Sequence, residues 1–141
     1  MTNKHSFIVS KNIKTIFDKL TAFCSYPTIL SDIRSVRCVG PNQYEFSIYV
    51  GILQLQKLVT YVLEFVLDKE TYTIKWKLIT SNHPTILLGN QGSWELIEIT
   101  NTQTVLTYQS TITTFSTFTD VFVSKQVPKT VHEIYTYLKK S

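Results

Sequence analysis

The last segment of the chain, Phe118 to Lys140, has the spacing of a helix with one buried face. Its apolar residues recur at i, i+3, i+4 and i+7, so they share one side of an α-helix. This stripe consists of Val127, Val131, Ile134, Tyr135 and Leu138, with Phe118 and Phe122 one turn apart ahead of it. The opposite side is largely polar, with Lys129, Thr130, Glu133, Thr136 and Lys140. A helix of this kind needs an apolar surface to cover.

From about Val36 to Ile112 the apolar residues instead alternate with polar ones, which is the period of β-strands. In the clearest case Ile74 and Trp76 face one way while Lys75 and Lys77 face the other. The expected strands are 35–39, 44–50, 54–68, 72–78, 91–99 and 104–113, with a turn at 40–43 and a loop at 80–90. The stretch 54–68 is apolar on both faces, which indicates a central strand with a bulge. The last helix should therefore cover an antiparallel sheet.

The first 33 residues predict a strand followed by two short helices. His5 to Ser10 contains the apolar run of a strand. Capping side chains at 10–12 then precede Ile13, Ile16, Phe17, Leu20 and Phe23, which have helical spacing. The segment 25–27 should break that helix, and Pro27 suits the first turn of a second one that runs through Ile33. The predicted class is α+β, with about six to seven strands wrapped around the C-terminal helix.

Length and composition limit the possible functions. The 141 residues are enough for one domain, 1–141, and 43% hydrophobic and 13% aromatic residues supply its core. The formal net charge of +4 is spread along the chain, so nucleic acid or ribosome binding is only weakly indicated. Cys24 and Cys38 lack metal-site spacing and are expected to be free thiols. The N-terminus lacks the apolar run of a signal peptide, and we expect a cytoplasmic protein.

Three groups of residues, in this order along the chain, resemble the START-like, or SRPBCC, superfamily, which includes the polyketide cyclase/dehydrase and coenzyme Q-binding families. They are Phe17, Leu20, Tyr26, Pro27 and Leu30; Gly92 to Leu96 followed by Thr104 to Tyr108; and Val127 to Lys129 with the ending Leu138-Lys139. The resemblance covers nearly the whole chain. It implies a helix-grip fold, in which a curved sheet encloses the C-terminal helix around a hydrophobic cavity. It implies no particular reaction, because one scaffold hosts many functions.

Large side chains are expected to surround this cavity, since aromatic walls with a few polar atoms orient apolar ligands. The predicted cavity residues are Phe46, Ile48, Tyr61, Leu63, Ile74, Trp76, Trp94, Tyr108, Phe122, Val131 and Tyr135. The alternative is that these side chains interdigitate and leave no space. Pro128 has two interpretations as well. Either it kinks the helix so that 118–127 acts as a lid, or the helix restarts there after an irregular joint at 124–127.

The chain offers few candidates for catalysis. His132-Glu133 lacks the second histidine of a zinc motif, and His5 and His83 have no matching ligands, so no metal and no cofactor are expected. Glu64 is a candidate acid with a raised pKa if it faces the cavity, although such a residue more often points to solvent. Glu95 is the other acid near the predicted sheet interior. Arg34 and Arg37 are candidates for an anionic headgroup or for surface ion pairs.

The interpretation that the sequence favours is a carrier or binding protein for a hydrophobic small molecule such as a lipid, quinone or polyketide. One alternative is an enzyme, a cyclase, aromatase or hydrolase, using Glu64 or a cavity tyrosine. Another is an interaction module for RNA or the ribosome. Transient membrane contact is expected only if part of the apolar group Phe115, Phe118, Val121, Phe122 and Val123 is exposed; burial against the short helices is the alternative. We expect a monomer or weak homodimer.

Overall fold

The computed structural model describes residues 2–52, 55–83, 87–114 and 117–140, but not the side chains of 51–56 and 117–120. The elements follow one another as β1 (Thr2–Val9), α1 (Ile13–Thr21), the 3₁₀ helix η1 (Phe23–Thr28), β2 (Ile33–Gly40), β3 (Gln43–Ile52), β4 (Leu55–Asp68), β5 (Thr73–Ser81), β6 (Leu87–Thr100), β7 (Gln103–Thr114) and α2 (Thr117–Lys139). The strands form one seven-stranded sheet in the order β1-β7-β6-β5-β4-β3-β2.

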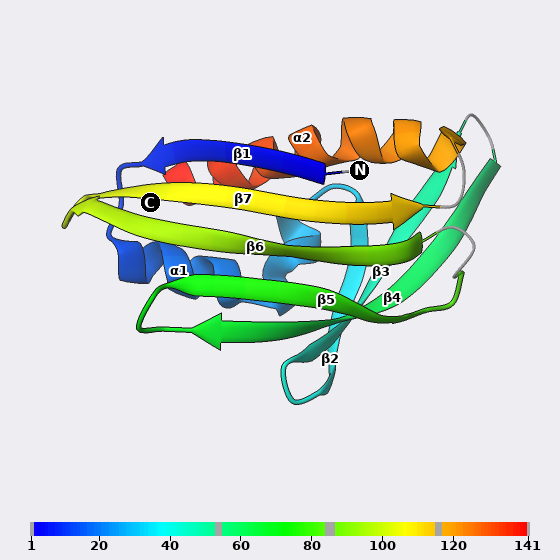
Figure 1. The fold of residues 1–141 in the computed structure, drawn as a ribbon, viewed down its shortest axis with the longest axis horizontal. Helices are drawn as coiled ribbons and strands as arrows, with labels where there is room; N and C mark the ends of the chain where they lie inside the picture. Colours follow the sequence, from blue (N-terminus) through cyan, green and yellow to red (C-terminus); the bar gives the residue numbers. More distant parts are fainter. Residues whose placement is uncertain (1, 53–54, 84–86, 115–116, 141) are drawn as a thin grey trace.

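All neighbouring strands pair antiparallel, and the sheet curves around α2. Figure 1 shows α2 running behind β1 and β7, while β3 and β4 rise toward the beginning of the helix. The helix contacts the neighbouring strands β1 and β7 at one edge of the sheet and β3 near the other edge. The predicted α+β architecture, with a curved antiparallel sheet around a C-terminal helix, is confirmed. The register between β4 and β5 shifts at Val62 and Leu63, where Ile79 of β5 is the extra residue, so the bulge predicted in β4 lies in its partner strand instead.

The α1 helix and the stripe of α2 form as the sequence predicts. The Asn12 side chain accepts a hydrogen bond of 2.9 Å from the backbone N–H of Lys14 and so caps α1. Along α2, Val127, Val131, Ile134 and Leu138 are buried, as the stripe requires. These residues form the buried face of the helix.

The second short helix is present, but its predicted bounds, from Pro27 through Ile33, are wrong. The short helix is η1, which ends at Thr28 and contains Pro27, and Ile33 already begins β2 by pairing with Ile48. The reason is tertiary packing: the Phe23 ring stacks on Phe65 with the ring centroids 4.0 Å apart. This contact places the short helix earlier in the chain than the local signals indicate. Local helix signals do not report such a long-range partner.

Two further predictions need correction. The loop expected at 80–90 is shorter, because Ser81 pairs with Tyr61 and Leu87 pairs with Thr114, which extends β5 and β6. The helix does not restart at Pro128: α2 is continuous through it, with no irregular joint at 124–127. Pro128 is exposed, while Val127 and Val131 on either side are buried. Packing on both sides therefore keeps the two parts of the helix in one register.

Among the described residues, no helix combines the length and apolar character that crossing a membrane requires.

Candidate ligand pocket

The C-terminal half of α2 is joined to the main hydrophobic core. Ile134 and Leu138 are buried in the cluster that also holds α1, η1 and the centre of the sheet. Tyr135 packs edge-on against Phe7 of β1, with the ring centroids 5.0 Å apart. Burial of large side chains on several elements holds this half of the helix in place.

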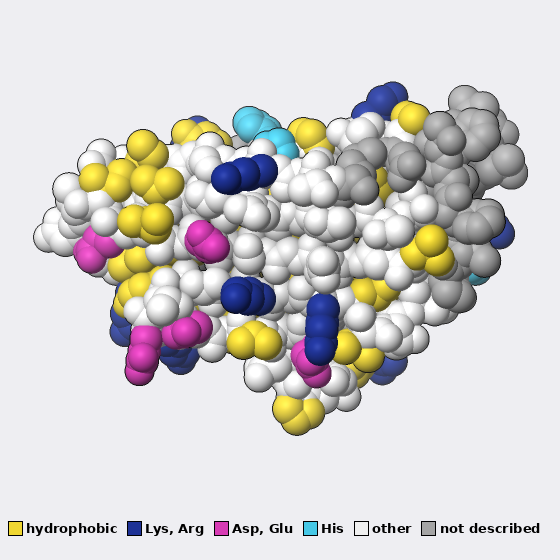
Figure 2. Space-filling model, in the orientation of Figure 1, with side chains coloured by type: hydrophobic (Ala, Val, Ile, Leu, Met, Phe, Trp, Pro, Cys, Tyr) yellow, Lys and Arg dark blue, Asp and Glu magenta, His cyan; other side chains and the backbone are white. Residues whose placement is uncertain are grey.

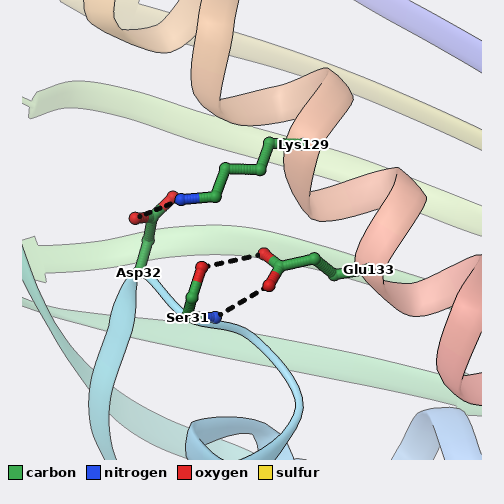
Figure 3. A network of polar contacts seen from close by, with 4 residues as sticks. All are labelled: Ser31, Asp32, Lys129 and Glu133. Atoms are coloured by element: carbon green, nitrogen blue, oxygen red, sulfur yellow. Dashed lines mark hydrogen bonds and ion pairs between the residues drawn. The ribbon is translucent and has the colours of Figure 1, made fainter.

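Polar contacts fasten the middle of α2 to the segment between η1 and β2, as Figure 3 shows. The Glu133 carboxylate accepts hydrogen bonds of 3.2 Å from both the backbone N–H and the hydroxyl of Ser31. One turn earlier, the Lys129 ammonium lies 3.1 Å from the Asp32 carboxylate. The side chains that the sequence places on the polar face of α2 therefore contact another part of the chain.

The N-terminal half of α2 is held differently. Val123, Val127 and Val131 form a second, separate cluster of buried residues with Ile112 of β7. Valine buries less surface than the leucine and aromatic side chains of the main core, so less free energy holds this half in place. The change between the two clusters lies close to Pro128 and to the ion pair of Lys129 with Asp32. Among the side chains that the structure describes, those of 121–127, the outer half of α2, are thus held by less apolar burial than those of 134–138.

A small pocket of about 50 Å³ lies beneath this outer half, between α2 and the inner face of the sheet. Its lining is mostly apolar and consists of Ile48, Val50, Val59, Tyr61, Leu87, Asn90, Ile112, Thr114, Phe122, Val123 and Gln126. Sites for drug-sized ligands usually measure about 300–1,000 Å³. The pocket in this conformation is therefore much smaller than a lipid or quinone.

The structure brings only some of the predicted cavity residues to this pocket. Ile48, Tyr61 and Phe122 line it. The others lie elsewhere on the inner side of the sheet or on α2: Phe46, Leu63, Ile74 and Trp94 are buried in the main core, Trp76, Tyr108 and Tyr135 pack against that core, and Val131 belongs to the second cluster. Whether these residues contact a ligand stays a prediction.

Several lining residues were not among the predicted ones. Val50, Val59 and Ile112 lie on the apolar faces of their strands, so alternation could have included them. Asn90 and Gln126 had no such signal, because polar residues near the end of a strand or on a helix usually face water. Asn90 is instead held by the Trp76 indole N–H, which donates to its Oδ1 at 3.1 Å.

Tyr61 and Tyr108 bring hydroxyl groups to the inner face of the sheet. Burial raises the pKa of Tyr61 well above the ordinary value, and the nearby Tyr108 raises that pKa further. Burial also raises the pKa of Tyr108. Both phenols therefore stay protonated at neutral pH and can donate hydrogen bonds.

Glu64, the candidate acid, does not face the pocket. It lies on the outer face of β4, where the Gln43 side-chain amide donates to it at 3.1 Å and the Lys77 ammonium lies 3.5 Å away. The hydrogen bond from Gln43, and then the charge of Lys77, lower the pKa of Glu64 instead of raising it. Glu95, on β6, is exposed as well. The described part of the chain contains no group of three or more potential metal-ligating side chains.

The remaining candidates from the sequence lie at the surface. Arg37 pairs with Glu45 at 2.7 Å, and Arg34 donates to the Tyr49 hydroxyl at 3.0 Å. Cys24 and Cys38 are both free and exposed. Figure 2 shows the outer face of the sheet, where basic and acidic side chains are interspersed over β1, β5 and β6. The described residues of this face form no concentrated basic patch of the kind that binds nucleic acid.

The apolar group at the start of α2 is partly exposed. Val121 is 46% exposed, Phe122 is half-buried and Val123 is buried. Val123 packs against Ile112 of β7 and not against the short helices. The side chains of Phe115 and Phe118 lie outside the described residues.

The topology and the position of α2 define a helix-grip fold of the START-like type, and comparison with solved structures bears this out. The chain is similar to the Zhui aromatase/cyclase from Streptomyces sp. R1128, with a TM-score of 0.79, 12% identity and coverage of 99% of this chain and 94% of that one. It is also similar to a START superfamily protein from Mycobacterium smegmatis, with a TM-score of 0.78, 14% identity and coverage of 98% and 94%.

A third similar structure is a conserved protein from Geobacillus kaustophilus, with a TM-score of 0.77, 17% identity and coverage of 100% and 97%. No protein-family model and no curated protein matches the sequence. At these identities the likeness establishes the START-like fold, the one that the sequence motifs predict, and leaves the activity to be inferred from the site.

Proposed function

We propose that the protein binds a hydrophobic small molecule, such as a lipid, quinone or polyketide-like compound, between the sheet and the N-terminal half of α2. The observation that carries the proposal is the apolar pocket beneath the part of α2 that three valines hold. The chain's START-like fold, which the sequence resemblance associates with carriers and cyclases, is consistent with such a site. Lipid, quinone and polyketide remain alternatives within one chemical class.

Binding requires the outer half of α2 to move away from the sheet, because the pocket is too small for such a ligand. Exposing the side chains of Val123 and Val127 would cost roughly 3–6 kcal/mol. A ligand that buries about 300 Å² of apolar surface gains roughly 7.5 kcal/mol at about 25 cal/mol per Å². This gain offsets the cost of exposing the two valines, and the remainder counts toward the cost of association.

Binding is favoured over catalysis by the character of the Tyr61 hydroxyl in the pocket. A general acid works best when its pKa lies near the working pH. Burial moves the pKa of Tyr61 away from neutrality, which favours hydrogen-bond donation over proton transfer. Glu64, the other candidate acid, is on the opposite face of the sheet.

The test is native mass spectrometry of freshly purified protein, followed by organic extraction and uptake from a panel of lipids and quinones. The variant Val50→Phe fills the pocket from β3, and Val66→Phe, on the exposed outer face of β4, is its control. We expect a bound mass, or uptake from the panel, in the wild type and in Val66→Phe but not in Val50→Phe. Protein that stays unliganded, or a ligand that Val50→Phe binds equally well, would contradict the proposal.

A further inference from the structure

The pairing between β5 and β6 stops partway along the two strands. Among the described residues their register ends at Lys77 of β5 and Gln91 of β6. Both strands nevertheless continue, because β5 pairs with β4 as far as Ser81 and β6 pairs with β7 from Leu87 onward. Figure 1 shows the ribbons of β5 and β6 diverging beyond the paired part. Two neighbouring strands therefore leave a gap in the sheet, between the end of β5 and the beginning of β6.

Each of the two strands carries an extra residue beside this gap. The register of β5 with β4 skips Ile79, and the register of β6 with β7 skips Leu88. Extra residues of this kind bend a strand, and they are frequent where pairing ends and next to functional sites. Both side chains are large and apolar, yet Ile79 is 45% exposed and Leu88 is 51% exposed. The register of each strand with its other neighbour thus accounts for the divergence and places apolar side chains beside the gap.

A groove of about 370 Å³ lies at this gap and contains residues from both faces of the sheet. On the outer face it is lined by Gly89 and Thr113, which are directly opposed in the register. It is also lined by Leu78, which packs against the main core, and by Asn90, which lies opposite the buried Ile112. A groove confined to the outer surface would not reach these two inner-face residues. The groove therefore extends between the two strands toward the interior.

Asn90 connects the groove to the ligand pocket beneath α2, because it lines both of them. The residues next to it in the chain divide between the two spaces: Leu87 lines the pocket, and Leu88 and Gly89 line the groove. The hydrogen bond from the Trp76 indole N–H to the Asn90 Oδ1 joins β5 and β6 near the point where their pairing ends. The outer groove and the inner pocket therefore meet at this side chain.

We infer that the hydrophobic ligand enters the pocket through the sheet, between β5 and β6 and past Asn90. This inference rests on the proposed function and adds the route of entry to it. A ligand that passes between paired strands must break their backbone hydrogen bonds, each of which stabilises the sheet. Beyond Lys77 and Gln91 the register of β5 and β6 holds no pair to break. The ligand contacts the exposed Leu88 first, displaces the Asn90 side chain and then pushes the outer half of α2 away from the inside.

The experiment obstructs the groove after the protein has folded. Gly89→Cys and Leu88→Cys each place a thiol at residues that line the groove and are not among the residues lining the pocket. A Cβ atom at position 89 would make an ordinary contact of 3.4 Å with Thr113 Oγ1, and Leu88 is exposed, so both positions tolerate a new side chain. Each thiol is then alkylated with N-phenylmaleimide, which adds a bulky ring to the folded protein.

The background and the control come from the same chain. Cys24→Ser and Cys38→Ser remove the two exposed native thiols, so that only the new cysteine reacts. Ser93→Cys is the control, because Ser93 lies on the outer face of β6 opposite Lys75, where β5 and β6 remain paired. Mass spectrometry measures the extent of labelling, and thermal unfolding shows that each labelled protein is folded.

Stopped-flow fluorescence follows the binding and release of Prodan, a neutral naphthalene ketone whose emission depends on the polarity of its surroundings. We expect the label at position 89 or 88 to slow association and dissociation equally, by about tenfold, which corresponds to about 1.4 kcal/mol on the barrier. The dissociation constant should stay the same, and the label at position 93 should change neither rate. Unchanged rates with the label at position 89 or 88 would overturn the route of entry and leave ligand binding intact. A weaker affinity with an unchanged association rate would do the same. If Prodan does not bind to the unlabelled protein, the proposed function and the inference both fail.

Discussion

Trp76 of β5 lies across Gly92 of β6, its direct partner in the sheet. A Cβ atom at position 92 would lie 2.5 Å from Cζ2 of Trp76 and 2.3 Å from the backbone oxygen of Gln109. The first contact displaces the indole and the second displaces a neighbouring strand. The absence of a side chain at Gly92 therefore allows Trp76 to cover β6 and to reach Asn90 at the pocket.

Replacement of Gly92 by alanine should destabilise the protein by about 1–3 kcal/mol or more, since overpacking forces side chains and backbone to shift. Chemical denaturation measures this change. Gly89→Ala is the matched control on the same strand, because its nearest contact would be an ordinary 3.4 Å from Thr113 Oγ1. Equal stability of the two variants would show that Trp76 does not require the glycine.

Loss of the Glu133 carboxylate should loosen the link between α2 and the segment before β2. We expect Glu133→Ala to lower the free energy of unfolding by about 1 kcal/mol, because two hydrogen bonds to Ser31 are lost at a partly exposed site. Ser31→Ala should cost less, because the backbone N–H of residue 31 can still donate to Glu133. If a double-mutant cycle shows no coupling between the two positions, this contact does not fasten the helix.

The two halves of α2 should open separately. Backbone amides of 122–127 are expected to exchange with solvent faster than those of 134–138, since the first set packs on the small valine cluster. Val127→Ala removes about 1.6 kcal/mol of apolar burial, at about 0.8 kcal/mol per carbon, and should speed exchange mainly in the first set. Leu138→Ala should cost about 2–5 kcal/mol and affect the whole protein. Equal exchange rates along the whole of α2 would contradict the prediction that its two halves open separately.

Asp68 should make stability depend on pH in the acid range. Hydrogen bonds from the backbone N–H groups of Thr71 and Glu70, at 3.2 and 2.9 Å, lower the pKa of this carboxyl below the ordinary 3.8. The unfolded chain therefore takes up a proton first, and the stabilisation is present above pH 3.8 and is lost as pH falls through the lower folded-state pKa.

Asp68→Asn keeps an acceptor oxygen in the turn between β4 and β5 and removes the titration. Thermal unfolding at a series of pH values should show a smaller loss of Tm on acidification for Asp68→Asn than for the wild type. Parallel curves for the two proteins would mean that Asp68 does not contribute to the acid sensitivity. Asp68→Ala should lower Tm at neutral pH, because the turn then loses its side-chain acceptor.

The sequence predicted those parts of the fold that depend on local periodicity. The stripe of α2 and the alternation of β3, β5 and β7 are found as expected, because a buried face selects its residues directly. The second short helix was misplaced, because the stacking of Phe23 on Phe65 joins residues far apart in the chain. Periodicity reports which face is buried but not which distant residue covers it.

The pocket could be predicted only in part for the same reason. Ile48 and Tyr61 lie on an apolar face, and alternation identifies them. The pocket's size depends on where α2 rests on the sheet, which no local pattern determines.

The most direct test of ligand binding beneath the outer half of α2 is methyl NMR of the valine side chains. With 2-ethylnaphthalene added, the methyl signals of Val59 and Val123 in the pocket and of Val127 beside it should shift. Those of Val66, on the outer face of β4, should stay in place. Shifts confined to Val66, or no saturable shift at any of these positions, would contradict a ligand site between the sheet and α2.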